Sequence, residues 1–310
     1  MASARELVVL GTASQVPTRS RNHNGYLLLW DGTGILFDPG EGTQRQLTLA
    51  GVAASRVDAI CLTHHHGDHC LGLPGVVQRR LLDGTRHPLD LYYPAAAEEV
   101  VSALLVAAGP AADSVRRHPV AAPGLVAEGR GWRLSAHRLD HRVPALAWRV
   151  EEPPARRVLP ERLAALGVAG PDVGRLLRLG ELEVGGRRVS ADEVSVPRRG
   201  QVFALVMDTR PCPGAVEAAR GADVVVCEAT FLEQDAELAQ AYAHCTARQA
   251  AGIAAAASAQ RLVLSHFSQR YGEDVTPFAA EAREVFGAVD VANDLDRVPL
   301  PKRRPQATLE

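Results

Sequence analysis

The sequence is short of several residue types, and each shortage excludes a class of protein. Aromatic residues make up only 5% of the chain, so base stacking is not expected to be the main mode of recognition if the protein binds nucleic acid. The cysteines are odd in number and lack CxxC spacing, which argues against a disulfide framework, a zinc knuckle or a disulfide-linked partner. They are Cys61, Cys70, Cys212, Cys227 and Cys245.

An excess of positive charge and a long apolar run are also missing. The formal net charge is −2, which excludes an overall positive field, so any contact with a polyanion must be local. No apolar run approaches the ~20 residues of a membrane span. The first residues lead into the apolar Leu7–Leu10 without a signal-peptide pattern. We expect a cytoplasmic protein that does not contact a membrane.

Short apolar segments alternate with helical patterns such as the Ala-rich stretch Thr246–Ala259, which predicts an α/β protein. The predicted strands include Gly25–Trp30, Gly34–Phe37, Asp58–Thr63, Val202–Met207, Asp223–Cys227 and Arg261–Ser265. Several strands run directly into an ionisable residue, namely Asp38, His64, Asp208, Glu228 and His266. Because strand ends form one edge of an α/β sheet, where ligands tend to bind, we expect these side chains to converge.

Residues 151–196 break this rhythm with many prolines and glycines among charged residues. We interpret them as an insertion in a single domain spanning residues 1–310. Within the insertion, the segment Ala155–Leu179 is locally basic, because Arg156, Arg157, Arg162, Arg175 and Arg178 stand against Glu161 and Asp172. Either a solvated surface loop or a local polyanion-binding surface fits this charge pattern.

The segment His64-His65-His66-Gly67-Asp68-His69 follows a predicted strand directly. This segment places four imidazoles and one carboxylate within six residues, and such close packing of donor groups is unfavourable unless cations bind there. In an extended chain His64 and His66 point to one side and can reach one ion, whereas His65 faces away. After the turn at Gly67, Asp68 and His69 can serve a second ion.

A pair of divalent ions needs more ligands than these four. The candidates are His141, Asp208 and His266 at other strand ends, and Asp208 suits a bridge because one carboxylate can bind two cations. Two ions held close together lower the pKa of a shared water and stabilise charge on a phosphoryl or carbonyl oxygen. This predicts a hydrolase but leaves its substrate open, because a thioesterase, a lactonase or a β-lactamase would use the same chemistry.

The histidine segment resembles the HxHxDH signature of the metallo-β-lactamase superfamily, and matching stretches run across nearly the whole chain. The resemblance implies a four-layer αββα sandwich that holds two zinc ions, although manganese or another divalent ion can occupy such sites. Carried over residue by residue, it implies His64, His66 and His141 on one ion, Asp68, His69 and His266 on the other, and Asp208 between them.

The flanking residues resemble the ribonuclease Z family more specifically. Pro17–Asn22 is similar to that family's PxKxRN loop, with Arg19 in place of Lys, and Thr63–Gly75 matches its extended metal motif. Further similar stretches are Phe37–Gln44, Asp208–Pro211 and Leu264–Tyr271. Two departures are Met207, where the family commonly has Gly, and Ala147-Trp148, where Gly-Tyr is usual.

This resemblance implies an endoribonuclease that removes the 3′ trailer from precursor tRNA and leaves a 3′ hydroxyl. Metal-bound hydroxide would attack the scissile phosphate, with Asp68 taking a proton from the attacking water. His244-Cys245-Thr246 fits the family's HxT motif, so His244 would assist the leaving 3′ oxygen, with Glu228 orienting it.

The family also carries a flexible arm, or exosite, that grips tRNA, usually across a homodimer so that one subunit's arm holds the substrate cut by the other. The insertion with Gly170-Pro171 looks like that arm. The residues expected to bind RNA are Arg19, Arg21, Arg156, Arg157, Arg162, Gly170, Pro171, Arg175 and Arg178. Two alternatives stay open, a small-molecule phosphodiesterase or thioesterase of the same fold and an RNA-binding module that has lost catalysis.

Overall fold

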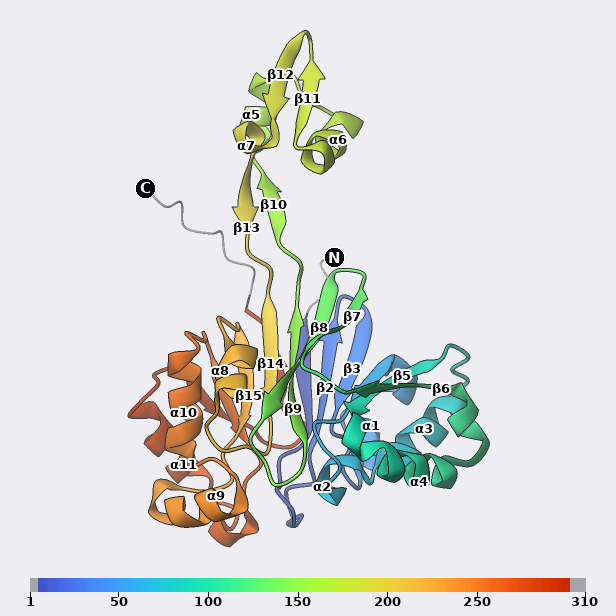
Figure 1. Cartoon of the computed structure of the whole chain (residues 1–310), viewed down its shortest axis with the longest axis vertical. Helices are drawn as coiled ribbons and strands as arrows, with labels where there is room; N and C mark the ends of the chain where they lie inside the picture. The colour runs from blue at the N-terminus through green and yellow to red at the C-terminus, as the bar shows by residue number, and fades with distance from the viewer. Residues whose placement is uncertain (1–4, 302–310) are drawn as a thin grey trace. The chain divides into compact units, whose positions relative to one another are not determined.

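The computed structural model describes residues 5–301, which form two compact units (Figure 1). The core unit comprises residues 5–151 and 202–301, and the inserted unit comprises Glu152–Gln201. The insertion expected at residues 151–196 therefore extends to Gln201. The first four and last nine residues of the predicted 1–310 domain lie outside the described part of the chain.

The first sheet of the core unit has the order β18-β1-β2-β3-β4-β5-β6. Strands β1 to β3 are antiparallel, with Leu7 opposite Leu28 and Leu28 opposite Ile35, whereas β3 to β6 are parallel. The strands are β1 (Glu6–Gly11), β2 (Gly25–Trp30), β3 (Thr33–Phe37), β4 (Ala59–Cys61), β5 (Leu89–Pro94), β6 (Val115–Val120) and β18 (Arg297–Pro299).

The second sheet has the order β17-β16-β15-β14-β9-β8-β7. Strands β14 to β17 are parallel, and β9 joins them antiparallel, with Glu151 opposite Val202. The strands are β7 (Gly124–Gly129), β8 (Trp132–Leu139), β9 (Ala145–Glu151), β14 (Val202–Val206), β15 (Val224–Glu228), β16 (Leu262–Ser265) and β17 (Val289–Val291).

Helices cover the outer face of each sheet. They are α1 (Thr43–Leu49), α2 (Gly67–Cys70), α3 (Leu73–Leu82) and α4 (Glu98–Ala108) beside the first sheet, and α8 (Pro213–Ala219), α9 (Ala236–Tyr242), α10 (Ala247–Ala256) and α11 (Thr276–Arg283) on the side of the second (Figure 1). The predicted helix at 246–259 is α10, and Thr246 begins it with a capping box, because its hydroxyl accepts from the Gln249 amide and Gln249 accepts from the Thr246 amide.

Alternating side chains on each strand pack into different layers. Val9 and Leu28 of the first sheet share a buried cluster with Trp148 and Phe203 of the second, so this cluster fills the space between the sheets. Val8, one residue from Val9, instead joins the cluster with α3 and α4. Because successive side chains on a strand point to opposite faces, both faces of each sheet are buried. The predicted four-layer αββα sandwich is confirmed.

One helical segment is long and apolar enough to cross a membrane by length and composition alone, although it contains Glu98, Glu99 and Asp113. Ala95–Ser114, which runs through α4, has 20 residues and contains an 18-residue stretch with a mean hydropathy of 1.4. A core helix of a globular protein meets the same criteria, and Val101, Leu105 and Ala108 pack in the cluster beneath it. The segment is therefore weak evidence for a membrane span.

The inserted unit is folded and has a small core of its own, formed by Val168, Leu176, Val189 and Val194 among others. Gly170 has a positive φ of 55°, which favours glycine, and it precedes α6. The elements are β10 (Ala155–Val158) paired with β13 (Ser195–Arg198), β11 (Glu181–Val184) paired with β12 (Arg187–Ser190), and the helices α5 (Pro160–Ala165), α6 (Pro171–Leu179) and α7 (Ala191–Val194).

Candidate metal centre

The ends of four core strands carry the ionisable residues that the sequence pattern singled out. Asp38 follows β3, Asp208 closely follows β14, His266 follows β16, and Glu228 is the last residue of β15. Asp38, Asp208 and His266 have positive φ values of 45°, 47° and 65°. Such conformations cost non-glycine residues about 1–3 kcal/mol each and concentrate at functional sites. The strand ends meet at one edge, as expected.

Three overlapping groups of potential metal ligands lie at this edge, and each has its ligand atoms within 4.8 Å of one another. They are His64, His66, His141 and Asp208; Asp68, His69 and His266; and Asp208, His244 and His266, of which the first two are called the two metal groups. In the first group His66 Nδ1 is 2.9 Å from His64 Nε2 and 3.4 Å from His141 Nε2. In the second group Asp68 Oδ2 is 3.3 Å from His69 Nε2 and 3.5 Å from His266 Nε2. The two metal groups match the ligand sets implied by the family resemblance, whereas the third group adds His244, which the resemblance does not make a ligand; none of the three contains His65.

Asp208 lies between the two groups and directs one carboxylate oxygen to each. Its Oδ2 is 3.5 Å from His64 Nε2 and 3.8 Å from His141 Nε2. Its Oδ1 is 3.3 Å from His69 Nε2 and 3.1 Å from His266 Nε2. This carboxylate therefore has one oxygen beside each group, the arrangement that a bridge between two ions would need.

The chemistry of the centre fits divalent cations. Asp208 Oδ1 and His266 Nε2 are buried and lack a hydrogen-bond partner among residues 5–301, although buried polar atoms are normally satisfied. Burial and the neighbouring histidines lower the pKa of His64 well below its ordinary value, and burial lowers that of His66 to about 4. Both imidazoles are therefore neutral at pH 7, the form that binds metal.

The surroundings of His69 show that the centre carries an excess of negative charge. Although burial opposes it, the carboxylates of Asp208, Asp68 and Asp38 hold the pKa of His69 well above its ordinary value. This excess of negative charge around a buried imidazole is the environment that a bound cation neutralises. The residues present therefore fit a pair of divalent ions.

A second layer of hydrogen bonds holds four imidazoles with Nε2 turned inward. His64 Nδ1 is 3.0 Å from the Thr63 hydroxyl, and His69 Nδ1 is 2.8 Å from Asp38 Oδ2. His141 Nδ1 is 2.9 Å from the Ala243 carbonyl, and His266 Nδ1 is 2.7 Å from the Thr230 hydroxyl. Asp38 also accepts hydrogen bonds from the amide and hydroxyl of Thr63, each at 2.7 Å. Such partners fix the orientation of metal-binding histidines.

Replacing Asp38 by asparagine is expected to weaken metal binding by about 10–100-fold, because an amide cannot accept from His69, Thr63 N and Thr63 Oγ1 together. Competition with a chelator of known affinity measures the loss. Asp58→Asn is the matched control, since Asp58 accepts from the Gly34 amide in the same sheet and from His87, outside the centre. Equal metal affinity in both variants would show that Asp38 does not orient His69.

His244 and Glu228 form a buried pair beside the metal groups. His244 Nδ1 is 3.0 Å from Glu228 Oε1, which also accepts from the Thr209 amide at 2.6 Å. Burial lowers the pKa of His244, but the carboxylates of Glu228 and Asp208 outweigh it and raise the pKa to about 9. His244 is therefore protonated at neutral pH and can donate a proton.

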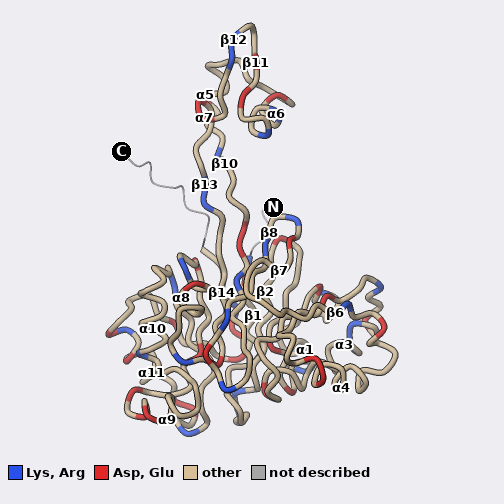
Figure 2. The backbone as a smooth tube through the Cα atoms, in the orientation of Figure 1, with Lys and Arg blue, Asp and Glu red and all other residues tan. Residues whose placement is uncertain are grey.

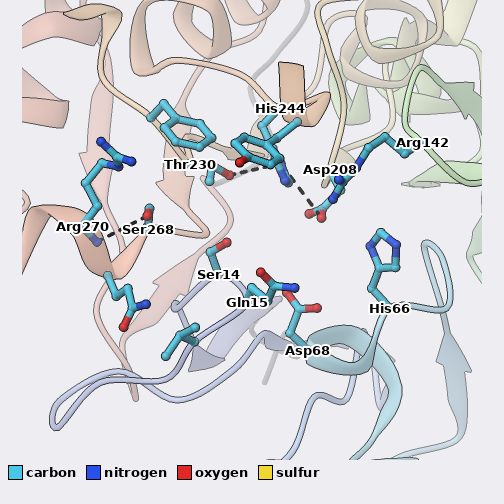
Figure 3. Close-up of a pocket in the computed structure, with 14 residues that line it drawn as sticks. Ser14, Gln15, His66, Asp68, Arg142, Asp208, Thr230, His244, Ser268 and Arg270 are labelled. Carbon is cyan, nitrogen blue, oxygen red and sulfur yellow. Dashed lines mark hydrogen bonds and ion pairs between the residues drawn. The ribbon is translucent and has the colours of Figure 1, made fainter. Parts of the chain in front are cut away.

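A cavity of about 380 Å³ opens onto this arrangement and includes His66, Asp68, Asp208 and His244 in its wall. Figure 3 shows Ser14 and Gln15 on one side and Thr230 with His244 on another. Further lining residues are Val16, Arg142, Phe231, Tyr242, Ser268, Gln269 and Arg270. None of these further residues was expected as a site residue, because they come from segments that are remote from one another in the chain.

The two arginines of the Pro17–Asn22 loop differ in their surroundings. Arg19 is exposed, whereas Arg21 is only 6% exposed. The Arg21 guanidinium donates to the Thr12 hydroxyl at 2.7 Å and the Ala292 carbonyl at 3.1 Å, and it lies over the Phe267 ring. The expectation that Arg21 contacts RNA is therefore corrected, since its contacts hold the loop against the C-terminal segment.

The arginines of the inserted unit differ in their partners, and Figure 2 shows acidic and basic residues interspersed in this unit. Arg156 pairs with Asp192 and donates to the Ser195 hydroxyl, and Arg175 pairs with Asp172 at 3.0 Å. Arg175 remains exposed despite this ion pair, and the remaining arginines of the basic segment, Gly170 and Pro171 are exposed as well. Those remaining arginines are Arg157, Arg162 and Arg178.

The cysteines, the two residues that depart from the family pattern and several histidines lie outside the two metal groups. All five cysteines are free. Met207 and Trp148, which depart from the family pattern, are buried between the sheets and do not line the cavity. The other histidines contact partners outside the two metal groups. These are His23 with Gln15, His87 with Asp58, His118 with Asp90 and His137 with Ser135.

Comparison with known proteins agrees with this geometry. The family model of the metallo-beta-lactamase superfamily matches residues 19–187. A ribonuclease Z of Nocardia farcinica is 57% identical over 97% of this chain and 100% of that protein, and one of Streptomyces coelicolor is 54% identical with the same coverage. The solved structure of human tRNase Z, short form, shares the fold, with 24% identity and a TM-score of 0.66 over 96% of this chain and 99% of that one. The chain therefore belongs to the ribonuclease Z family of the metallo-β-lactamase superfamily.

Proposed function

We propose that this chain is an endoribonuclease that removes the 3′ trailer from precursor tRNA and leaves a 3′ hydroxyl on the tRNA. The observation that carries the proposal is a complete set of candidate metal ligands beside the hydrogen-bonded His244–Glu228 pair in one cavity. Relatives that match nearly the whole chain bear the name ribonuclease Z. The substrate would be met in the cytoplasm.

The centre would hold two zinc ions, one on His64, His66 and His141 and one on Asp68, His69 and His266, with Asp208 on both; manganese or another divalent ion is compatible with the same ligands. When bound, such ions lower the pKa of water and neutralise charge on a phosphate. Asp68 and Asp208 are ionised, the form in which a carboxylate binds a metal ion. Despite their burial, the neighbouring histidines hold both carboxyl pKa values well below their usual range.

Two side chains would move the protons of the reaction. Water attacks the scissile phosphorus, and Asp68 accepts a proton from that water as the new P–O bond forms. As the bond to the 3′ oxygen breaks, His244 donates its proton to that oxygen. Glu228 holds the His244 ring through Nδ1, so the other ring nitrogen is the one that serves the substrate. The buried Glu228 carboxylate also keeps His244 protonated.

The inserted unit would act as the arm that holds tRNA away from the cut. Its exposed Arg157, Arg162 and Arg178 suit contacts with the phosphate backbone, and the exposed turn at Gly170-Pro171 can approach the RNA closely. Arg19 of the core unit would add a contact. In the homodimer we expect for this family, the arm of one subunit holds the substrate that its partner cleaves.

The test is incubation of the purified, metal-loaded chain with a precursor tRNA that carries a 3′ trailer, followed by mapping of both product ends at nucleotide resolution. We expect a single cut near the discriminator nucleotide, with a 3′ hydroxyl on the tRNA. Intact RNA together with hydrolysis of a small phosphodiester or a thioester would move the assignment to a small-molecule hydrolase. Bound RNA without any turnover would indicate an RNA-binding module.

Removal of the metal is expected to abolish cleavage, because the ions held by the two metal groups would supply the positive charge that stabilises the phosphate in the reaction. Dialysis against a chelator should lower turnover by more than ~10³-fold, and zinc or manganese should restore it. Elemental analysis of the active sample should give two metal ions per chain. Full turnover in a sample with less than one ion per chain would contradict the two-metal assignment.

A further inference from the structure

One aromatic side chain in the wall of the cavity is not explained by the metal centre. Tyr242, the last residue of α9, is 47% exposed and lines the same cavity as Asp68 and His244. Within residues 5–301 it is the only aromatic among the exposed large hydrophobic residues. An exposed aromatic ring beside a candidate catalytic centre is a feature that ligand binding explains better than packing does.

The neighbours of Tyr242 hold its ring in place. The Phe231 and Tyr242 rings are nearly parallel, with an interplanar angle of 12° and centroids 6.4 Å apart. The Arg142 guanidinium carbon lies 5.5 Å from the centroid of the Tyr242 ring, within the range of a cation–π contact. Arg142 is itself exposed and lines the cavity (Figure 3). A ring constrained in this way loses little freedom when a planar ligand stacks on it.

The aromatic pair lies next to the residue that serves the leaving oxygen. The Phe231 ring is 6.1 Å from the His244 ring between centroids, and Phe231 in turn lies beside Tyr242. The nucleotide whose 3′ oxygen receives the proton from His244 carries its base on the same sugar. The base of that nucleotide can therefore reach the aromatic pair while its 3′ oxygen remains at His244.

We infer that Tyr242, supported by Phe231 and Arg142, is the stacking platform for the base of the last nucleotide retained on the tRNA. The inference rests on the proposed function. Stacking uses the π-face that every base has, so the platform accepts any base and requires only that one is present. Arg142 adds positive charge for the backbone phosphate of the same nucleotide. Tyr242 is thus a positioning residue that places the scissile phosphate through the neighbouring base.

The experiment compares three precursor tRNAs with the metal-loaded chain. One is intact, one lacks the base of the last retained nucleotide, and one lacks the base of the first trailer nucleotide. With the intact precursor, Tyr242→Ala should lower kcat/KM by about tenfold, the effect of losing one stacked base. Tyr242→Phe, which keeps the ring, should stay within about twofold of the unaltered chain.

Removal of the last retained base should slow the unaltered chain by the same factor, and Tyr242→Ala should lose nothing more on that substrate. The inference would be overturned if the losses from Tyr242→Ala and from removal of the last retained base multiplied, since the two changes would then act independently. It would also be overturned if Tyr242→Ala were non-additive only with removal of the first trailer base. Leu82→Ala, at an 80% exposed position of α3, is the control for surface substitution. Melting temperature and metal content of each variant exclude misfolding. If the unaltered chain fails on the intact precursor, the proposed function itself is wrong.

Discussion

Asp68→Ala is expected to reduce precursor tRNA cleavage by at least ~10³-fold while leaving tRNA binding within a few-fold of the unaltered chain. The carboxylate faces His69 Nε2 and His266 Nε2 and lines the cavity, so its loss removes both a candidate metal ligand and the proposed proton acceptor. Binding depends on other surfaces, including the arginines of the inserted unit. Single-turnover rates and a binding titration at fixed salt separate the two effects.

Asp113→Ala is the matched control, since Asp113 is an exposed carboxylate outside the two metal groups. A third variant, Asp68→Asn, keeps the shape of the side chain but cannot serve as the proton acceptor. It should therefore also be slow, even in samples that retain metal. The assignment of Asp68 would fail if the alanine variant lost tRNA affinity but retained metal-dependent turnover.

Removing the inserted unit is expected to lower cleavage of precursor tRNA by about 100-fold or more, because a second binding site on the same substrate raises the overall affinity by that order. Hydrolysis of a small aryl phosphodiester should persist in the shortened chain. Glu151 and Val202 are register partners in β9 and β14, and the Glu152 amide donates to the Gln201 carbonyl at 2.8 Å. An Asn-Gly turn can therefore replace Pro153–Gly200 and close the hairpin.

A point-substituted version keeps the unit folded. Arg157, Arg162 and Arg178 are changed together to glutamine, and the control is the pair Arg187 and Arg188, whose side chains form ion pairs with Glu193 and Glu181. The first set should weaken tRNA cleavage and reduce its dependence on salt, since fewer phosphates are neutralised. Equal loss on tRNA and on the small diester, in either the deletion or the triple variant, would rule out the role of the unit as the tRNA-binding arm.

The sequence alone was sufficient to identify the fold class, the family and the candidate metal ligands. These depend on short motifs at strand ends, where a few adjacent residues such as His64, His66 and Asp68 determine the chemistry locally. The alternation of apolar segments predicted β2, β14, β15 and β16 for the same reason. Strand β7 was not predicted, because it is an antiparallel strand that is largely exposed and its apolar alternation is weak.

Tertiary structure decided the role of each polar residue around those motifs. Arg21 was expected to meet RNA but is buried, and Arg156 and Arg175 pair with carboxylates of their own unit. The contact of Asp38 with His69 and the approach of Phe231 to Tyr242 likewise join residues that no local motif connects. A motif specifies which chemical groups are present, whereas the exposure and the partner of each group depend on chain segments that only the folded packing brings together.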